Sequence, residues 1–269
     1  GIYGDTGMVG KELDRTLVHH DRAEVVFRQN SRRSEGDIAD CDVAFLATRD
    51  PESMAFAPEA LDAGARVIDM AGAFRLPRED FEAWYKLKHE TPDLLQDAVY
   101  GMPALYANEI AKARLVANPG CYPTSVILPL RPLKNLVEGP AVIVATSGNS
   151  GARSEVEETS NELTYSYGRR HKHVPEMERY SGFDVSFTPI VLRSVFAGIN
   201  TNIRVALNEE LRAADVAETE ARLRDTISSA YRDEDLVRVV VDDADTQWGT
   251  REAVGTHKLL VKLNVDEGY

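Results

Sequence analysis

The first 120 residues alternate between short apolar runs and helical patterns, and few architectures accommodate that order. Strand-like runs occupy positions 23–29, 42–47, 66–70 and 115–117. Apolar residues at helical spacing occupy positions 11–19, 58–63 and 81–89. Because parallel strands are joined by helical crossovers, this order predicts an α/β fold with a doubly wound, Rossmann-like parallel sheet.

Three glycines, Gly4, Gly7 and Gly10, stand directly before the first helical pattern. A glycine turn that opens a helix lets backbone N–H groups approach a pyrophosphate at the positive end of that helix. The usual dinucleotide fingerprint is spaced two and then three, so this spacing is a variant, and a plain turn is the alternative. We expect the cofactor to be bound along this loop by Gly4, Thr6, Gly7, Met8 and Val9.

Two arginines follow the second strand-like run, in the order Ser31, Arg32 and Arg33. An acidic residue at this place binds the ribose 2′-hydroxyl of NAD, whereas arginine accommodates the 2′-phosphate of NADP. A solvated basic turn would explain the same composition. Together with the upstream glycines, the pattern favours NADP, bound by these three residues.

Cys121 lies between the turn signal Pro119-Gly120 and Pro123, which suits the first turn of a helix. We therefore expect Cys121 near a helix N-terminus, where the helix dipole lowers the pKa of a thiol and favours the nucleophilic thiolate. The alternative is a small buried apolar cysteine. Cys41, which precedes a strand-like run without a glycine turn, fits that alternative.

Of the six histidines, only His171 and His173 form a cluster with a nearby acid, Glu176, and neighbouring cations. A His-x-His pair could bind zinc, but no second Cys/His pair completes a site, so we expect no metal. A basic surface loop is the remaining alternative. A strand-like run at 141–146 leads into a Ser- and Gly-rich turn at 147–151, which could form an anion nest or a simple flexible turn. Arg153 follows it.

The pattern changes after Cys121. Strand-like runs follow one another at 141–146, 184–192, 200–207, 236–241 and 258–265, with one long helix at about 209–231. This order predicts an α+β domain built on a mixed sheet. We expect a dinucleotide-binding domain over residues 1–120 and a catalytic and oligomerisation domain over residues 121–269.

Charge and composition exclude several classes of partner. With 31 basic and 44 acidic side chains the net charge is −13, which argues against nucleic acid as a partner. No apolar run approaches the roughly 18 residues of a membrane span, so we expect no membrane partner. Two cysteines are too few for a disulfide scaffold, which favours the cytoplasm.

Six runs, taken together, resemble a known family. They lie at 4–10, 69–76, 100–103, 118–124, 147–152 and 171–176. Their order is that of the N-acetyl-gamma-glutamyl-phosphate reductases, which belong to the aspartate-semialdehyde-dehydrogenase-like group. The run Asn118-Pro119-Gly120-Cys121-Tyr122-Pro123 is the most specific of them. The family ends in a helix that returns to the cofactor domain, so we expect residues to be missing from both ends of this chain.

The resemblance implies an NADPH-dependent reduction of an acyl phosphate to a semialdehyde, in arginine biosynthesis. Cys121 would form the thioester, and the His-x-His motif would supply the acid/base, for which we choose His173 with His171 as the substitute. The residues expected around the substrate are Asn118, Ser147, Gly148, Arg153, His171 and Glu176. The resemblance also implies a homo-oligomer, a dimer or a tetramer.

Three alternatives stay open from the sequence. One is a reductase of carrier-protein-bound aminoadipyl or glutamyl phosphate. A basic rim around the site would favour it, and this chain could supply one at Arg169, Arg170 and Lys172. Another is aspartate-semialdehyde dehydrogenase, against which the run around Cys121 weighs. The non-enzymatic alternative is a nucleotide-binding redox sensor, which would need no cysteine at a helix start.

Overall fold

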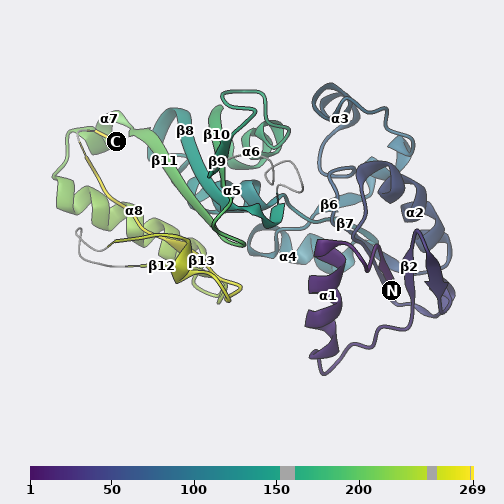
Figure 1. The fold of residues 1–269 in the computed structure, drawn as a ribbon. Helices are drawn as coiled ribbons and strands as arrows, with labels where there is room; N and C mark the ends of the chain where they lie inside the picture. The colour runs from purple at the N-terminus through teal and green to yellow at the C-terminus, as the bar shows by residue number, and fades with distance from the viewer. Residues whose placement is uncertain (152–160, 241–246, 267) are drawn as a thin grey trace. The chain divides into compact units, whose positions relative to one another are not determined.

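The chain divides into two units, Gly1–Gly120 and Cys121–Tyr269 (Figure 1). The structure is a computed structural model that describes residues 1–151, 161–240, 247–266 and 268–269. Each unit contains its own sheet and is described separately.

A seven-stranded sheet forms the centre of the first unit, in the order β3-β2-β1-β4-β5-β7-β6. Its strands are β1 (Ile2–Tyr3), β2 (Arg28–Asn30), β3 (Arg33–Glu35), β4 (Val43–Leu46), β5 (Arg66–Asp69), β6 (Ala98–Tyr100) and β7 (Leu115–Ala117). All neighbours pair in parallel except β2 and β3, which form an antiparallel hairpin at the edge. The predicted doubly wound α/β class is confirmed.

Helices connect these strands: α1 (Met8–Val18), α2 (Asp50–Asp62), α3 (Arg78–Tyr85) and α4 (Pro103–Lys112). Apolar residues of α2 and α3 join the strands in a core that includes Tyr3, Leu46, Met54, Phe81 and Leu115. Cys41 also belongs to this core, as expected.

The second strand begins later than the run at 23–29 predicts. β1 contributes only Ile2 and Tyr3 to the ladder, and these pair with Arg28 and Gln29. The carbonyl oxygen of Phe27 still accepts a hydrogen bond from the N–H of Ile2, and Phe27 is buried in the core, but the apolar residues before it have no partner on β1.

The second unit is built on a four-stranded sheet in the order β11-β8-β10-β9. Its strands are β8 (Val137–Gly148), β9 (Glu162–Thr164), β10 (Val185–Leu192) and β11 (Ile199–Leu207). β8 and β10 are parallel, whereas β11 and β9 pair antiparallel with them, so the predicted mixed sheet is confirmed. Helices α5 (Cys121–Leu130) and α6 (Val174–Ser181) pack on each other and against β11 and β10.

The long helix expected at 209–231 is divided into α7 (Glu209–Arg212) and α8 (Val216–Ala230). Asp215 causes the division, because its side chain accepts hydrogen bonds from the N–H groups of Ala217 and Glu218 and so caps a new helix. Two short parallel strands, β12 (Val237–Val239) and β13 (Leu259–Val261), complete the unit. They are shorter than the runs at 236–241 and 258–265, and residue 241 lies outside the described residues.

Candidate active site

The glycine loop joins β1 to α1, and at two of its three glycines the backbone is packed too tightly for a side chain. Gly4 has a φ of +82°, and a Cβ there would lie 2.4 Å from the carbonyl oxygen of Ala47. A Cβ on Gly10 would lie 2.1 Å from the carbonyl oxygen of Gly4. Gly7 is different, because its Cβ would meet only an ordinary contact at 3.4 Å. Glycine at this position therefore leaves the start of α1 open without being required by the packing of the chain.

The start of α1 is exposed and offers backbone donors. Gly7 is the N-cap residue and makes no side-chain cap, so N–H groups in the first helical turn have no side-chain acceptor. Thr6, Met8 and Val9 are exposed beside it. The structure thus places five of the expected cofactor residues, Gly4 to Val9 without Asp5, on one short segment.

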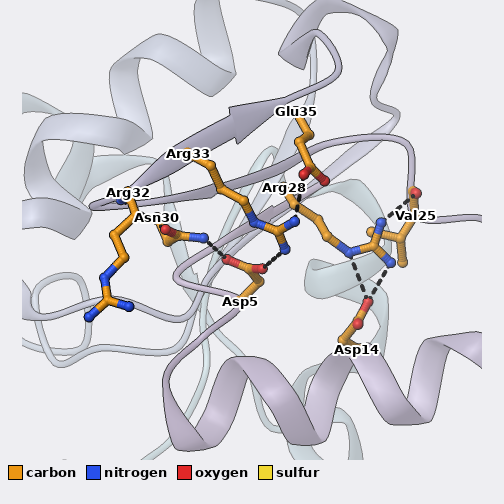
Figure 2. Close-up of polar contacts among 8 residues, drawn as sticks. All are labelled: Asp5, Asp14, Val25, Arg28, Asn30, Arg32, Arg33 and Glu35. Carbon is orange, nitrogen blue, oxygen red and sulfur yellow. Dashed lines mark hydrogen bonds and ion pairs between the residues drawn. The ribbon is translucent and has the colours of Figure 1, made fainter.

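The hairpin between β2 and β3 carries Ser31, Arg32 and Arg33 at its tip, and all three are exposed. Figure 2 shows that the two arginines point in different directions. Arg33 faces Asp5 of the glycine loop, whereas Arg32 points away from it.

The segment that leads to Cys121 begins at the carboxyl end of β7. The carbonyl oxygen of Asn118 accepts a hydrogen bond of 2.7 Å from Nε of Arg75, and the N–H of Asn118 donates to the backbone carbonyl oxygen of Asp69. Arg75 is only 7% exposed and also donates to the carbonyl oxygen of Met70. Asn118, expected among the substrate residues, is therefore held through its backbone.

Cys121 is the first residue of α5 and its side chain is exposed. Next to it, Tyr122 is buried, and its hydroxyl lies 2.8 Å from Oγ of Ser147 at the end of β8. This hydrogen bond joins the first turn of α5 to the strand that carries Ser147. Sequence reasoning missed Tyr122, although its position beside Cys121 was a usable signal.

His171 and His173 pack with Tyr122 in one aromatic cluster. The ring centroids of the two histidines are 4.7 Å apart. The ring centroid of Tyr122 lies 5.7 Å from that of His171 and 6.0 Å from that of His173. Phe187 of β10 and Tyr165 also contact His171. The structure thus brings the histidine pair to the residue that follows Cys121, within the second unit.

The protonation state of His171 follows from its contacts. Its Nδ1 accepts a hydrogen bond of 3.1 Å from the N–H of His173, so Nδ1 carries no proton and Nε2 is the N–H of the neutral ring. Burial, with a smaller effect of the Lys172 cation, lowers the pKa of His171 to about 4. His171 is therefore a neutral hydrogen-bond donor at physiological pH.

His173 is the N-cap residue of α6, and Glu176 is fully buried in the first turn of that helix. Both lie on the element that also packs against α5. The position of His173 at a helix start, two residues from His171, explains why the pair reaches the cluster together.

The turn after β8 does not form the anion nest that its composition suggests. The N–H groups of Gly148, Asn149 and Ser150 donate to the carbonyl oxygens of Gly198, Val195 and Phe196. Since these donors are already used, Gly148 offers no backbone N–H to an anion, and Ser147 is hydrogen-bonded to Tyr122. Arg153 lies outside the described residues.

Within the described ranges, no group of three or more His, Cys, Asp or Glu side chains is placed to hold a metal ion. In the same part of the chain, no helix is long and apolar enough to cross a lipid bilayer. The chemistry available is that of Cys121 at a helix start, followed by Tyr122, which packs with the neutral His171 and with His173.

Comparisons with known proteins show the family of the chain. The family model "Semialdehyde dehydrogenase, NAD binding domain" matches residues 33–113, and "Semialdehyde dehydrogenase, dimerisation domain" matches residues 121–269. The N-acetyl-gamma-glutamyl-phosphate reductase of Methanopyrus kandleri is 33% identical over 99% of this chain and 89% of its own length. That of Thermus thermophilus is 43% identical over 68% of this chain and 61% of its own length.

Solved structures of aspartate semialdehyde dehydrogenases share the fold. Aspartate semialdehyde dehydrogenase II of Vibrio cholerae has a TM-score of 0.66 at 20% identity, and the match covers 97% of this chain and 86% of the Vibrio cholerae chain. The Candida albicans enzyme with NADP has a TM-score of 0.69 at 15% identity, covering 94% of this chain and 84% of its own.

Proposed function

Because the chain belongs to the N-acetyl-gamma-glutamyl-phosphate reductases, a family of semialdehyde dehydrogenases, we propose that it reduces N-acetyl-gamma-glutamyl phosphate to the semialdehyde with NADPH. The observation that carries the proposal is Cys121, exposed at the start of α5 and followed by Tyr122, whose ring packs with His171 and His173. The chain is thus an oxidoreductase, and the reaction would serve arginine biosynthesis, as the names of its relatives imply.

The glycine loop fits a dinucleotide. Gly7 is not required by the packing of its own chain, which is what a position kept open for a bound group needs. Gly4, Thr6, Gly7, Met8 and Val9 would hold the diphosphate at the start of α1. The neighbouring hairpin, which carries Ser31, Arg32 and Arg33, would hold the 2′-phosphate, which makes NADP the proposed cofactor.

Cys121 makes and breaks the bond to the acyl group. The helix start favours the thiolate, which attacks the carbonyl carbon of the acyl phosphate, and inorganic phosphate leaves with the electron pair of the broken C–O bond. The resulting thioester is more electrophilic than a carboxylate. When bound, NADPH supplies the hydride that reduces its carbonyl carbon.

His173, as the general acid/base, protonates the oxygen of that carbon and takes the proton back as the C–S bond breaks, which releases the semialdehyde and regenerates the thiolate. His171 is less suited to proton transfer, because a pKa of about 4 keeps it neutral at the pH where the enzyme works. Its Nε2–H can instead donate a hydrogen bond to substrate. Asn118, Ser147, Gly148 and Glu176 would shape the surroundings of this site, through Tyr122 in the case of Ser147.

We further propose that the second unit forms a homo-oligomer through the outer face of its sheet. Ala141, Ile143 and Ala145 of β8 are buried, whereas Val142 and Val144 on the opposite face are 51% and 38% exposed. These two exposed valines, together with the dimerisation-domain model that matches residues 121–269, support contact with a second copy of the same face.

The test of the function is an assay of the reverse reaction with purified protein. Reduction of NADP⁺ is followed with a panel of semialdehydes that includes N-acetylglutamate semialdehyde and aspartate semialdehyde, each with and without inorganic phosphate. We expect phosphate-dependent reduction with the N-acetylated substrate and little with the other. Equal rates, or preference for aspartate semialdehyde, would contradict the proposed substrate.

A further inference from the structure

The glycine loop and the β2–β3 hairpin are joined by a small polar cluster centred on Asp5 (Figure 2). Nη2 of Arg33 lies 2.7 Å from Oδ2 of Asp5, and Nδ2 of Asn30 donates to Oδ1 of the same carboxylate at 2.8 Å. Asn30 also accepts a hydrogen bond of 2.9 Å from the N–H of Arg32, which fixes the turn of the hairpin. One amide side chain therefore links the hairpin tip to the loop.

Asp5 depends on these partners because it is buried. Its side chain is only 5% exposed. Burial by itself would raise the pKa of Asp5, but the hydrogen bonds from Asn30 and Arg33 outweigh it and the pKa is lowered. Removing one partner would leave a buried carboxylate without its compensating charge, in the loop that begins at Gly4.

The two arginines have different numbers of partners. Arg33 is held by two carboxylates, since its Nη1 also donates to Oε1 of Glu35 at 2.5 Å. The guanidinium of Arg32 makes no hydrogen bond or ion pair with any residue of the described ranges, and it points away from the cluster in Figure 2. The charge of Arg33 is therefore offset by Asp5 and Glu35, whereas that of Arg32 is available to an incoming anion.

We propose that Arg33 and Asp5 are a positioning pair that holds the glycine loop against the hairpin for NAD and NADP alike, and that Arg32 is the arginine that distinguishes the 2′-phosphate from the 2′-hydroxyl. The proposal rests on the dinucleotide site proposed above. It separates two residues that the sequence treats as equivalent.

The experiment measures the dissociation constants of NADP⁺ and NAD⁺ for the whole chain and its variants by titration calorimetry. Arg32→Ala should weaken NADP⁺ binding by about tenfold or more and leave NAD⁺ binding unchanged, because one charge-assisted contact to phosphate is lost. Arg33→Ala should weaken both cofactors by the same factor, so that the ratio of the two dissociation constants stays that of the wild type.

Three further variants separate positioning from misfolding. Arg33→Lys keeps the charge beside Asp5 and should recover part of the lost affinity for both cofactors. Glu12→Gln changes an exposed acid of α1 that pairs with Arg15 outside the cluster and should leave both affinities unchanged. Asp5→Asn combined with Arg33→Gln should cost less than the sum of the two single changes, since the second change removes a group already without its partner.

Selective loss of NADP⁺ binding in Arg33→Ala would overturn the proposal, as would equal loss of both cofactors in Arg32→Ala. The proposed preference for NADP is tested separately, by the two dissociation constants of the wild-type chain. A wild-type chain that binds NAD⁺ and NADP⁺ equally would contradict the NADP preference, while the positioning pair would still be judged by the loss of NAD⁺ affinity in Arg33→Ala.

Discussion

Nε of Arg75 donates a 2.7 Å hydrogen bond to the carbonyl oxygen of Asn118, three residues before Cys121. The guanidinium is buried and spans the loop after β5 and the segment after β7 through the carbonyl oxygens of Met70 and Asn118. It therefore fixes the backbone at Asn118, near the end of the first unit, although only 7% of Arg75 is exposed.

Arg75→Lys should lower turnover about tenfold, because lysine cannot supply the two directed N–H bonds of a guanidinium and the Asn118 segment loosens. The rate of alkylation of Cys121 by iodoacetamide, measured against pH, should change with it, while NADP⁺ affinity stays the same. Arg78→Lys is the control, since Arg78 is exposed and pairs only with Glu82 among the contacts described. An unchanged alkylation profile in Arg75→Lys would show that Arg75 has no part in placing the thiol.

Cys121→Ser should abolish turnover and the covalent thioester, because a serine hydroxyl at a helix start stays protonated, whereas the cysteine thiol can form the nucleophilic thiolate. Mass spectrometry of the protein mixed with acyl phosphate measures the adduct. Cys41→Ser is the matched control and should keep near wild-type activity, since Cys41 lies in the core of the first unit. An active Cys121→Ser variant would rule out the covalent route.

His173→Asn should reduce kcat by about 10²–10⁴-fold with little change in KM, the range for loss of a general acid/base. His171→Asn should reduce kcat less, because His171 is already neutral with a pKa of about 4 and acts as a hydrogen-bond donor. Single-turnover measurements separate acylation of Cys121 from the later step. A larger loss of kcat in His171→Asn would reverse the assignment within the pair.

Asp69 predicts a stability change between pH 4 and 6. It is fully buried, and burial raises its pKa from 3.8 to about 6, against smaller opposing effects of hydrogen bonds from Ser53 and Ala71. Between these values the folded state holds a proton that the unfolded state has released, so Asp69 lowers stability as pH rises. The difference of about two pKa units corresponds to about 3 kcal/mol.

Asp69→Asn should therefore gain stability relative to the wild type as pH rises from 4 to 6, with the difference constant above pH 6. Urea unfolding across this range measures it, with Glu52→Gln, a change of an exposed acid on α2, as the reference variant. Parallel curves for Asp69→Asn and the wild type would contradict the raised pKa.

Val144→Lys should shift the oligomer towards the monomer in sedimentation velocity, because a charge would be buried at the proposed sheet-face interface. Val216→Lys on α8 is the control, since Val216 is 55% exposed on a helix outside that sheet. An unchanged sedimentation coefficient in Val144→Lys would place the interface elsewhere.

The sequence by itself determined the class of the fold and the place of Cys121 at the start of a helix. Periodicity and turn residues act locally, so the alternation before Cys121 was enough to predict a doubly wound sheet, and the strands after it a mixed one. Pro119-Gly120 and Pro123 placed Cys121 at a helix start for the same reason. The boundaries at 23–29 and 209–231 were wrong, because strand partners and the Asp215 cap set them.

Only the tertiary structure decided what individual side chains are free to do. Arg32 and Arg33 are identical in type and adjacent in sequence, yet Asp5, which lies 28 residues before Arg33, engages only the second of them. Likewise, the amides of the turn after Ser147 look available in sequence but are used by residues 195–198. In both cases the hydrogen-bond partners come from segments that are distant along the chain, and no local pattern records them.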